Sequence, residues 1–138
     1  MPVSEHLVAA YRAARYVVYA ESAPVMRIGE PCPEMDELLE AEDAASAAFI
    51  TPFNPRGLPA HEEVNELAFG ELCDAADRTG HRIYLGEGND PRGEWKPEAS
   101  LLIVGIARAD AEALGRRFHQ NAIVFVEKGK APELVLLE

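Results

Sequence analysis

The sequence has little of what export, membrane insertion or metal binding requires. Its two cysteines, Cys32 and Cys73, belong to no recognisable motif, and its four histidines do not fall at metal-ligand spacing. No apolar run approaches the ~20 residues that a membrane span needs, and the N-terminal MPVSEHLVAAYRAAR has no basic region ahead of a hydrophobic core. We therefore expect a cytoplasmic protein with no signal peptide, no membrane segment and no metal site.

Basic residues are also scarce. The chain has 13 Lys and Arg against 24 Asp and Glu, which gives a net charge of −11. Generic nucleic-acid binding needs a basic patch that contacts phosphates, and the nearest group here, Arg108, Arg116 and Arg117, is small. We expect no nucleic-acid partner, and the acidity by itself indicates solubility.

What the chain does contain is typical of one globular α+β domain over residues 1–138. It is 48% hydrophobic and 27% charged. Caps and periodicity predict helices from Ser4 to about Arg15, from Pro33 on, from His61 to about Thr79 and from Asp110 on; they predict strands at 16–20, 25–28, 48–53, 82–85, 101–106, 122–126 and 133–137. From residue 48 to 126 the order is strand, helix, strand, strand, helix, strand. This order predicts an antiparallel-dominated sheet with a ferredoxin-like split βαβ core.

The helix from His61 shows the clearest apolar face. We expect that face to contain Val64, Leu67, Ala68, Leu72, Ala75 and Ala76. Asn65 borders it, and asparagine is a poor residue for a helix interior, so its side chain should bond to a group across one end of the sheet.

The stretch GEGNDPRGEWKPEAS, residues 86–100, is predicted to be one long loop before a buried strand. Loops of this length in compact domains are usually functional or disordered, and the single Trp95, with Glu98 and Ser100 close to the strand, favours function. Gly86-Glu87-Gly88 is a weak match to a phosphate-binding turn, because the third glycine is missing.

Right-handed crossovers in this topology bring polar residues from four segments to one end of the sheet. The segments end or begin there, and the residues are Thr51, Asn54, Asn65, Trp95, Glu98, Ser100, Gln120 and Asn121. A cleft with a few convergent polar groups is the usual form of a ligand site, so we predict a site at this end.

Each candidate also has a structural interpretation. Glu98 and Ser100 point to the same side and either act on a ligand, with Glu98 as a base, or tie down the loop. Trp95 either stacks on a planar ligand or pins the loop to the sheet. Asn54 precedes a proline and is also a common turn starter, whereas Gln120 and Asn121 could cap the last helix.

Four stretches together resemble the family known as domain of unknown function 3293, a mainly bacterial and uncharacterised group. They are FITPFNPRG (49–57), HEEVNELAFGEL (61–72), GEGNDPRGEWKPEAS (86–100) and RRFHQNAIVFV (116–126). The resemblance implies a single small cytoplasmic domain, and it marks as signature positions Thr51, Asn54, Asn65, Trp95, Glu98, Ser100, Phe118 and Gln120. His119 departs from the family pattern, where a glycine is more usual, which makes it a poor catalytic candidate.

The leading functional prediction is a domain that binds a small-molecule or nucleotide-like ligand and that could be catalytic. Glu98 would be its base or acceptor; Thr51, Asn54, Asn65, Ser100 and Gln120 would position the ligand, and Trp95 would cover it. The alternative is a non-catalytic interaction protein that uses the acidic helix around residues 34–43, or an acidic mimic of nucleic acid. The sequence specifies neither a cofactor nor an oligomeric state.

Overall fold

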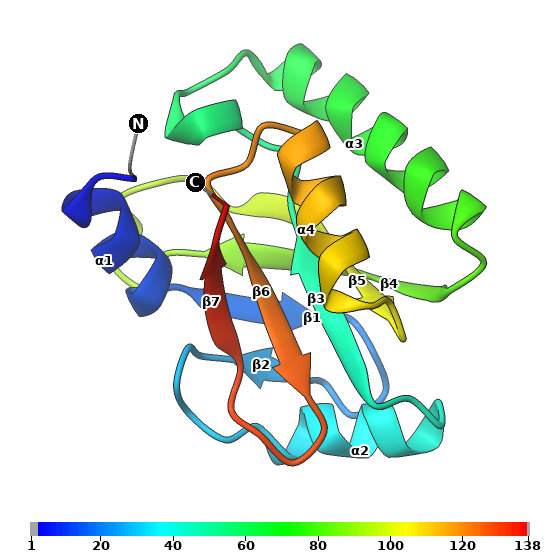
Figure 1. The fold of residues 1–138 in the computed structure, drawn as a ribbon. Coiled ribbons are helices and arrows are strands. Elements are labelled where there is room, and N and C mark those ends of the chain that lie inside the picture. Colours follow the sequence, from blue (N-terminus) through cyan, green and yellow to red (C-terminus); the bar gives the residue numbers. More distant parts are fainter. Residues whose placement is uncertain (1–2, 138) are drawn as a thin grey trace.

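The computed structural model describes residues 3–137, which form helices on both faces of one seven-stranded sheet (Figure 1). In chain order the elements are α1 (Glu5–Ala13), β1 (Arg15–Val18), β2 (Val25–Met26), α2 (Pro33–Ala41), β3 (Ser46–Ile50), the short 3₁₀ turn η1 (Pro55–Gly57), α3 (Glu62–Arg78), β4 (Arg82–Asn89), β5 (Glu98–Val104), α4 (Arg108–Arg117), β6 (Ala122–Glu127) and β7 (Glu133–Leu136). None of the described helices combines the length and the apolar character that crossing a membrane would take.

The middle of the sheet confirms the predicted split βαβ core. The strand order is β2-β1-β4-β5-β3-β6-β7, and every neighbouring pair is antiparallel. β3 and β4 flank β5, and α3 makes the crossover between them; α4 makes the matching crossover from β5 to β6. The N-terminal hairpin β1–β2 extends one edge of this core, and β7 extends the other. The α+β class predicted from the sequence is therefore correct.

Each face of the sheet has its own apolar core. α1 and α2 lie over one face, called the inner face here, where the core includes Tyr16, Leu39 and Phe49. α3 and α4 cover the outer face, where it includes Leu72, Ile103 and Phe125. Alternation along β3 assigns Ala47 and Phe49 to the inner core and Ala48 and Ile50 to the outer core, as expected for a strand buried on both sides. Figure 1 shows the sheet curling, with β6 and β7 running steeply across the direction of β1 and β4.

The buried face of α3 differs from the predicted one. Val64 and Leu67 are 50% and 71% exposed, whereas Asn65 is only 7% exposed and lies with Leu72 and Ala76 in the buried stripe. The polar partners of Asn65 set this rotation of the helix, because turning Val64 inward would take the Asn65 amide away from them. Apolar periodicity alone gave the wrong stripe at the start of this helix.

Several predicted boundaries also move. The proposed loop 86–100 is strand at both ends: β4 continues through Asn89 and β5 begins at Glu98, so the irregular segment covers 90–97 only. The strand predicted at 48–53 ends as β3 at Ile50, two residues before Pro52. Asp110 is not a cap, because α4 begins at Arg108 and Ala107 holds the capping position. The predicted cap of the first helix is correct, since the Ser4 side chain accepts from the Leu7 amide.

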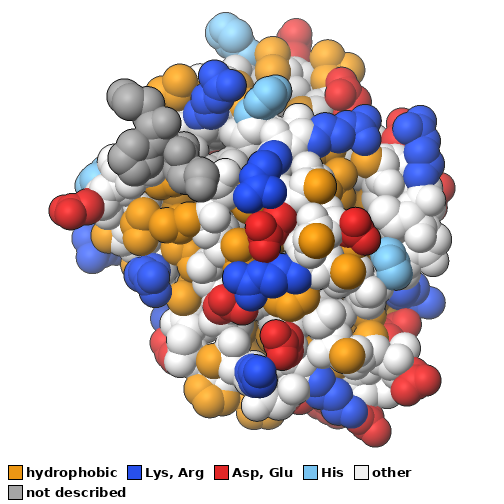
Figure 2. Space-filling view, in the orientation of Figure 1, with side chains coloured by type: hydrophobic (Ala, Val, Ile, Leu, Met, Phe, Trp, Pro, Cys, Tyr) orange, Lys and Arg blue, Asp and Glu red, His pale blue; other side chains and the backbone are white. Residues whose placement is uncertain are grey.

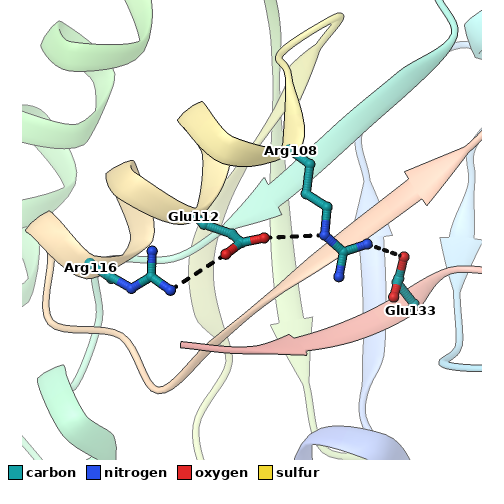
Figure 3. A network of polar contacts seen from close by, with 4 residues as sticks. All are labelled: Arg108, Glu112, Arg116 and Glu133. Carbon is teal, nitrogen blue, oxygen red and sulfur yellow. Dashed lines mark hydrogen bonds and ion pairs between the residues drawn. The ribbon is translucent and has the colours of Figure 1, made fainter. Parts of the chain in front are cut away.

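A chain of ion pairs joins α4 to the edge strand β7 (Figure 3). Arg116 contacts Glu112 at 3.4 Å, Glu112 contacts Arg108 at 3.1 Å, and Arg108 contacts Glu133 at 2.6 Å. Such exposed pairs contribute little individually. They do pair Arg108 and Arg116, two of the three arginines of the small basic group in the sequence, with carboxylates. Figure 2 shows basic and acidic side chains interspersed over this face.

Candidate functional site

A cavity of about 240 Å³ lies on the inner face, between α1 and the curled sheet. Residues of α1, of six strands and of the loops around Asn54 and Trp95 line it. The lining extends from Tyr16 on β1 to Leu134 on β7, strands close to opposite edges of the sheet. A flat sheet would hold these two residues far apart, so the curl of the sheet creates this space.

Five aromatic rings contribute to the walls of the cavity. Tyr16 and Phe49 pack edge to face with their centroids 5.5 Å apart, and Tyr11, Phe53 and Trp95 complete the set. Trp95 comes from the 90–97 segment, which Asp90 organises by accepting hydrogen bonds from the amides of Arg92 and Glu94. The Trp95 side chain packs against the inner core and also borders the cavity. The two predicted roles, pinning the segment to the sheet and covering a ligand, therefore require the same position of the ring.

Two glycines of β4 make room for these rings. A Cβ atom on Gly86 would lie 2.5 Å from the Val17 carbonyl oxygen and 2.8 Å from the Phe49 ring. Gly88 stands directly between Tyr16 on β1 and Glu98 on β5, and a Cβ there would meet nothing closer than the Tyr16 ring at 3.7 Å. The sequence GEG is therefore not a phosphate-binding turn: it lies in a strand paired on both sides, and its glycines open the inner face.

Asn54 is the centre of the polar network. Its backbone is left-handed, with φ 48°, a conformation that asparagine tolerates. The Asn54 amide N–H donates to Asn65 Oδ1 at 2.9 Å, and Asn65 Nδ2 donates back to Asn54 Oδ1 at 3.1 Å. Asn54 Oδ1 also accepts from the Ala60 amide, while Asn54 Nδ2 donates to Glu98 Oε2 at 2.8 Å. The pair thus fixes a strained turn and holds the Glu98 carboxylate in place.

Glu98 is the carboxylate of the cavity. Burial raises its pKa above the ordinary value, and the hydrogen bond from Asn54 opposes this shift only in part. Only Oε2 has a hydrogen-bond donor among the described residues. The second oxygen, Oε1, is left for a group in the cavity. The Glu98 carboxylate bonds no backbone group of the 86–100 segment, and it links that segment to the Asn54 turn through the Asn54 side chain.

The polar atoms of the remaining predicted residues form hydrogen bonds mainly with backbone groups. Thr51 Oγ1 donates to the Ala99 carbonyl at 2.8 Å and accepts from the Phe53 amide. Ser100 is fully buried, and its hydroxyl donates to the Glu98 carbonyl at 3.0 Å. Gln120 Nε2 donates to the carbonyls of Phe53 and Phe118, which leaves Gln120 Oε1 without a donor among the described residues.

Helix α1 forms the roof of the cavity and is attached through Tyr11. The Tyr16 hydroxyl donates to the Tyr11 carbonyl at 2.5 Å, and Asn121 Nδ2 donates to the Tyr11 hydroxyl at 3.1 Å. Burial raises the pKa of both phenols, so both stay neutral at physiological pH. None of the side chains of α1 is fully buried, and Leu7 packs close to Gly57 of the Asn54 turn.

His119 ends α4 instead of serving the site. Its φ is 56°, and the amides of His119 and Gln120 bond to the carbonyls of Arg116 and Gly115, which is a Schellman motif. Glycine is the residue that this left-handed position favours. The physical role of position 119 is therefore to terminate the helix, and Gln120 follows that turn back to the cavity.

Six of the seven predicted site residues line the cavity, and one does not. Thr51, Asn54, Trp95, Glu98, Ser100 and Gln120 line it, whereas Asn65 supports Asn54 from behind. Sequence reasoning missed the aromatic walls, Tyr11, Tyr16, Phe49 and Phe53, and the gap at Gly88. The alternation of Gly86 and Gly88 was the available signal, since in a strand it places both on one face. Within residues 3–137 no group of three His, Cys, Asp or Glu side chains could hold a metal ion.

Fold and cavity together define a small α+β protein that surrounds a mainly apolar pocket with five aromatic rings and one carboxylate. A family model described as protein of unknown function (DUF3293) matches residues 50–123, and the chain belongs to this family. The matched stretch contains all seven predicted site residues and ends before β7, and it does not include α1 or β1. No curated protein and no solved structure gave a match to the chain.

Proposed function

We propose that this protein binds one compact organic ligand in the cavity beneath α1. The observation that carries the proposal is the combination of an aromatic cavity with a half-buried carboxylate that keeps one oxygen free. Concave, mostly apolar pockets with a few fixed polar groups are the usual form of small-molecule sites.

The volume limits the size of the ligand. An apolar cavity of ~150 Å³ can hold benzene, and pockets for drug-sized ligands start near ~300 Å³. About 240 Å³ therefore fits a molecule with one or two rings. Of the ligands predicted from the sequence, this favours a small ring compound or a nucleobase-sized molecule over a whole nucleotide.

In this proposal each side chain of the cavity has a separate role in binding the ligand. Glu98 accepts from the ligand or takes a proton from it, and its raised pKa moves it toward the range that suits a general base. Asn54, held by Asn65, fixes the position of the carboxylate. Trp95 and the rings of Tyr16 and Phe49 cover the apolar body of the ligand.

The acidic helix α2 gives less support to the alternative, an interaction protein. Asp36 accepts from the Gly129 amide at 2.8 Å, Glu40 pairs with Lys128, and Glu42 accepts from the Tyr84 hydroxyl. Half of the acidic residues in this stretch are thus engaged within the chain.

Both cysteines are free thiols, which supports a reducing cytoplasm as the site of action.

A thermal-shift screen tests the proposal. Wild-type protein is compared with Gly88→Val over a panel of metabolites that ranges from single-ring compounds to nucleotides. Valine at position 88 fits the strand and fills the cavity between Tyr16 and Glu98, so it should preserve the apo melting temperature and abolish the shift by any true ligand. The proposal fails if no compound stabilises the wild type, or if each hit stabilises Gly88→Val equally.

A further inference from the structure

The charge of the cavity is not balanced from within. Its lining includes the Glu98 carboxylate and, among the described residues, no lysine or arginine. His6 on α1 also borders the cavity, but it is exposed. A carboxylate that burial has partly taken out of water costs free energy unless a cation or several donors compensate it.

The hydrogen bonds around the cavity leave acceptors facing it. Glu98 receives one donor, Asn54 Nδ2, on Oε2, and Oε1 receives none among residues 3–137. Gln120 has used both amide hydrogens on carbonyls, so Oε1 is what it can still offer. The Tyr16 hydroxyl is committed to the Tyr11 carbonyl. The side-chain donors left on the cavity wall are the Tyr11 hydroxyl, the Trp95 indole N–H and the second Asn54 N–H, all neutral, besides the ring of the exposed His6.

The aromatic walls suit a positive charge. Ring faces attract an ammonium group within ~6 Å, and the attraction is larger where water is excluded. Tyr11, Tyr16, Phe49, Phe53 and Trp95 all border the space next to Glu98. The net charge of −11 also favours the approach of cations over anions.

We infer that the ligand of this cavity is an organic cation: a primary or secondary ammonium group on a body of one or two rings, with the ammonium on Glu98 Oε1 and the body between Tyr16, Phe49 and Trp95. This inference rests on the proposed function and specifies its ligand class. The ammonium supplies the positive charge that the cavity lacks, and the rings replace the water around it.

Three probes of nearly equal size and shape separate charge from shape: phenethylamine, phenethyl alcohol and phenylacetate, measured by isothermal titration. The amine should bind wild-type protein about 5- to 10-fold more tightly than the alcohol, since hydrogen bonds to charged groups are stronger by ~1 to 1.5 kcal/mol. Phenylacetate should bind weakest, because it would place two carboxylates together.

Glu98→Gln is the decisive variant. It keeps an oxygen that can accept from Asn54 and from a ligand, but it removes the charge. The preference for amine over alcohol should disappear, with amine binding weakened about 5- to 10-fold and alcohol binding nearly unchanged. Glu87→Gln is the matched control: Glu87 lies one residue from Gly88, and its carboxylate accepts from Tyr19 on the opposite face, so this variant should retain the preference.

The pH dependence gives a second readout. The affinity for phenethylamine should increase as pH rises through the pKa of Glu98 and then level off, while that for the alcohol should stay flat. The other titratable groups of the lining are Tyr11 and Tyr16, whose raised pKa values keep them neutral, and His6. The profile is therefore measured in the His6→Gln background.

The outcomes are distinct. If the alcohol binds as tightly as the amine, or if Glu98→Gln retains the preference, the cation inference is wrong, whereas the cavity proposal stands. If none of the three probes binds but the metabolite panel gives a neutral hit that Gly88→Val abolishes, the inference again fails alone. If no compound binds in either experiment, both fail.

Discussion

Replacing Asn65 by alanine should strongly destabilise the protein although Asn65 touches no ligand. The change removes two hydrogen bonds, at 2.9 and 3.1 Å, from a residue that is 7% exposed. Each is worth about 1 kcal/mol net, and the buried Asn54 amide N–H that loses its acceptor adds about 1 to 3 kcal/mol. Alanine returns about 0.5 kcal/mol through its higher helix propensity. The expected net loss is about 2.5 to 4.5 kcal/mol.

Urea unfolding of the apo protein measures this loss directly, and the melting temperature should fall by about 10 °C. Glu66→Ala is the matched control, because Glu66 neighbours Asn65 on α3 and is exposed; it should change stability by less than about 0.5 kcal/mol. A loss below about 1 kcal/mol for Asn65→Ala, or equal losses for both variants, would refute the claim that the Asn54–Asn65 pair holds the turn beside the cavity.

Three further changes have defined directions. His119→Gly should raise the free energy of unfolding by about 0.5 to 1 kcal/mol, because a left-handed residue ends α4 there; a decrease would contradict the Schellman end. Gly86→Ala should lower it by about 2 kcal/mol, since the new Cβ would press on the Val17 carbonyl and the Phe49 ring; unchanged urea unfolding would argue against this packing. The pKa of Glu98 is raised in the native state, so the native protein holds that proton more tightly than the unfolded chain and loses stability as pH rises between the two pKa values. Glu98→Gln lacks this loss, and its stability relative to wild type should therefore increase from acid to neutral pH; a pH-independent difference would contradict the burial of the carboxylate.

The central fold was predictable because its signals are local. Residues 101–106 and 122–126 are apolar runs of strand length, the helix from His61 has a long apolar period, and crossover handedness then leaves few topologies. Gly86 and Gly88, by contrast, led to a wrong prediction. Because glycine usually weakens a strand, the second half of β4 was predicted as loop. In the structure both residues belong to the strand, and their lack of side chains leaves room for the aromatic rings that pack over them.

The candidate site was predictable in its polar part and, apart from Trp95, not in its aromatic part. Thr51, Asn54, Glu98 and Gln120 follow or precede regular elements, so topology alone brings them to one region. Tyr16 and Phe49 have the pattern of ordinary core residues. They border a cavity only because the sheet curls and the glycines of β4 lack side chains; the glycines are visible in the sequence, whereas the curl is not.

The orientation of α3 illustrates the same limit. Val64 and Leu67 match the apolar period, but the helix buries Asn65 instead. A reciprocal amide pair with a residue in a left-handed turn outweighs the burial of two aliphatic side chains at the end of a helix. Such a pairing joins residues 54 and 65 through geometry, and hydrophobic periodicity carries no information about it.

Trp95 offers the most direct test of the central claim, because it is the single tryptophan of the chain and borders the cavity. Its fluorescence is followed while phenethylamine is added to wild-type protein and to Gly88→Val. The account predicts a saturable change in the emission of Trp95 in the wild type and none in the filled variant. The same response in both proteins would contradict a ligand site beneath α1, and no response in the wild type would contradict an organic cation as its ligand.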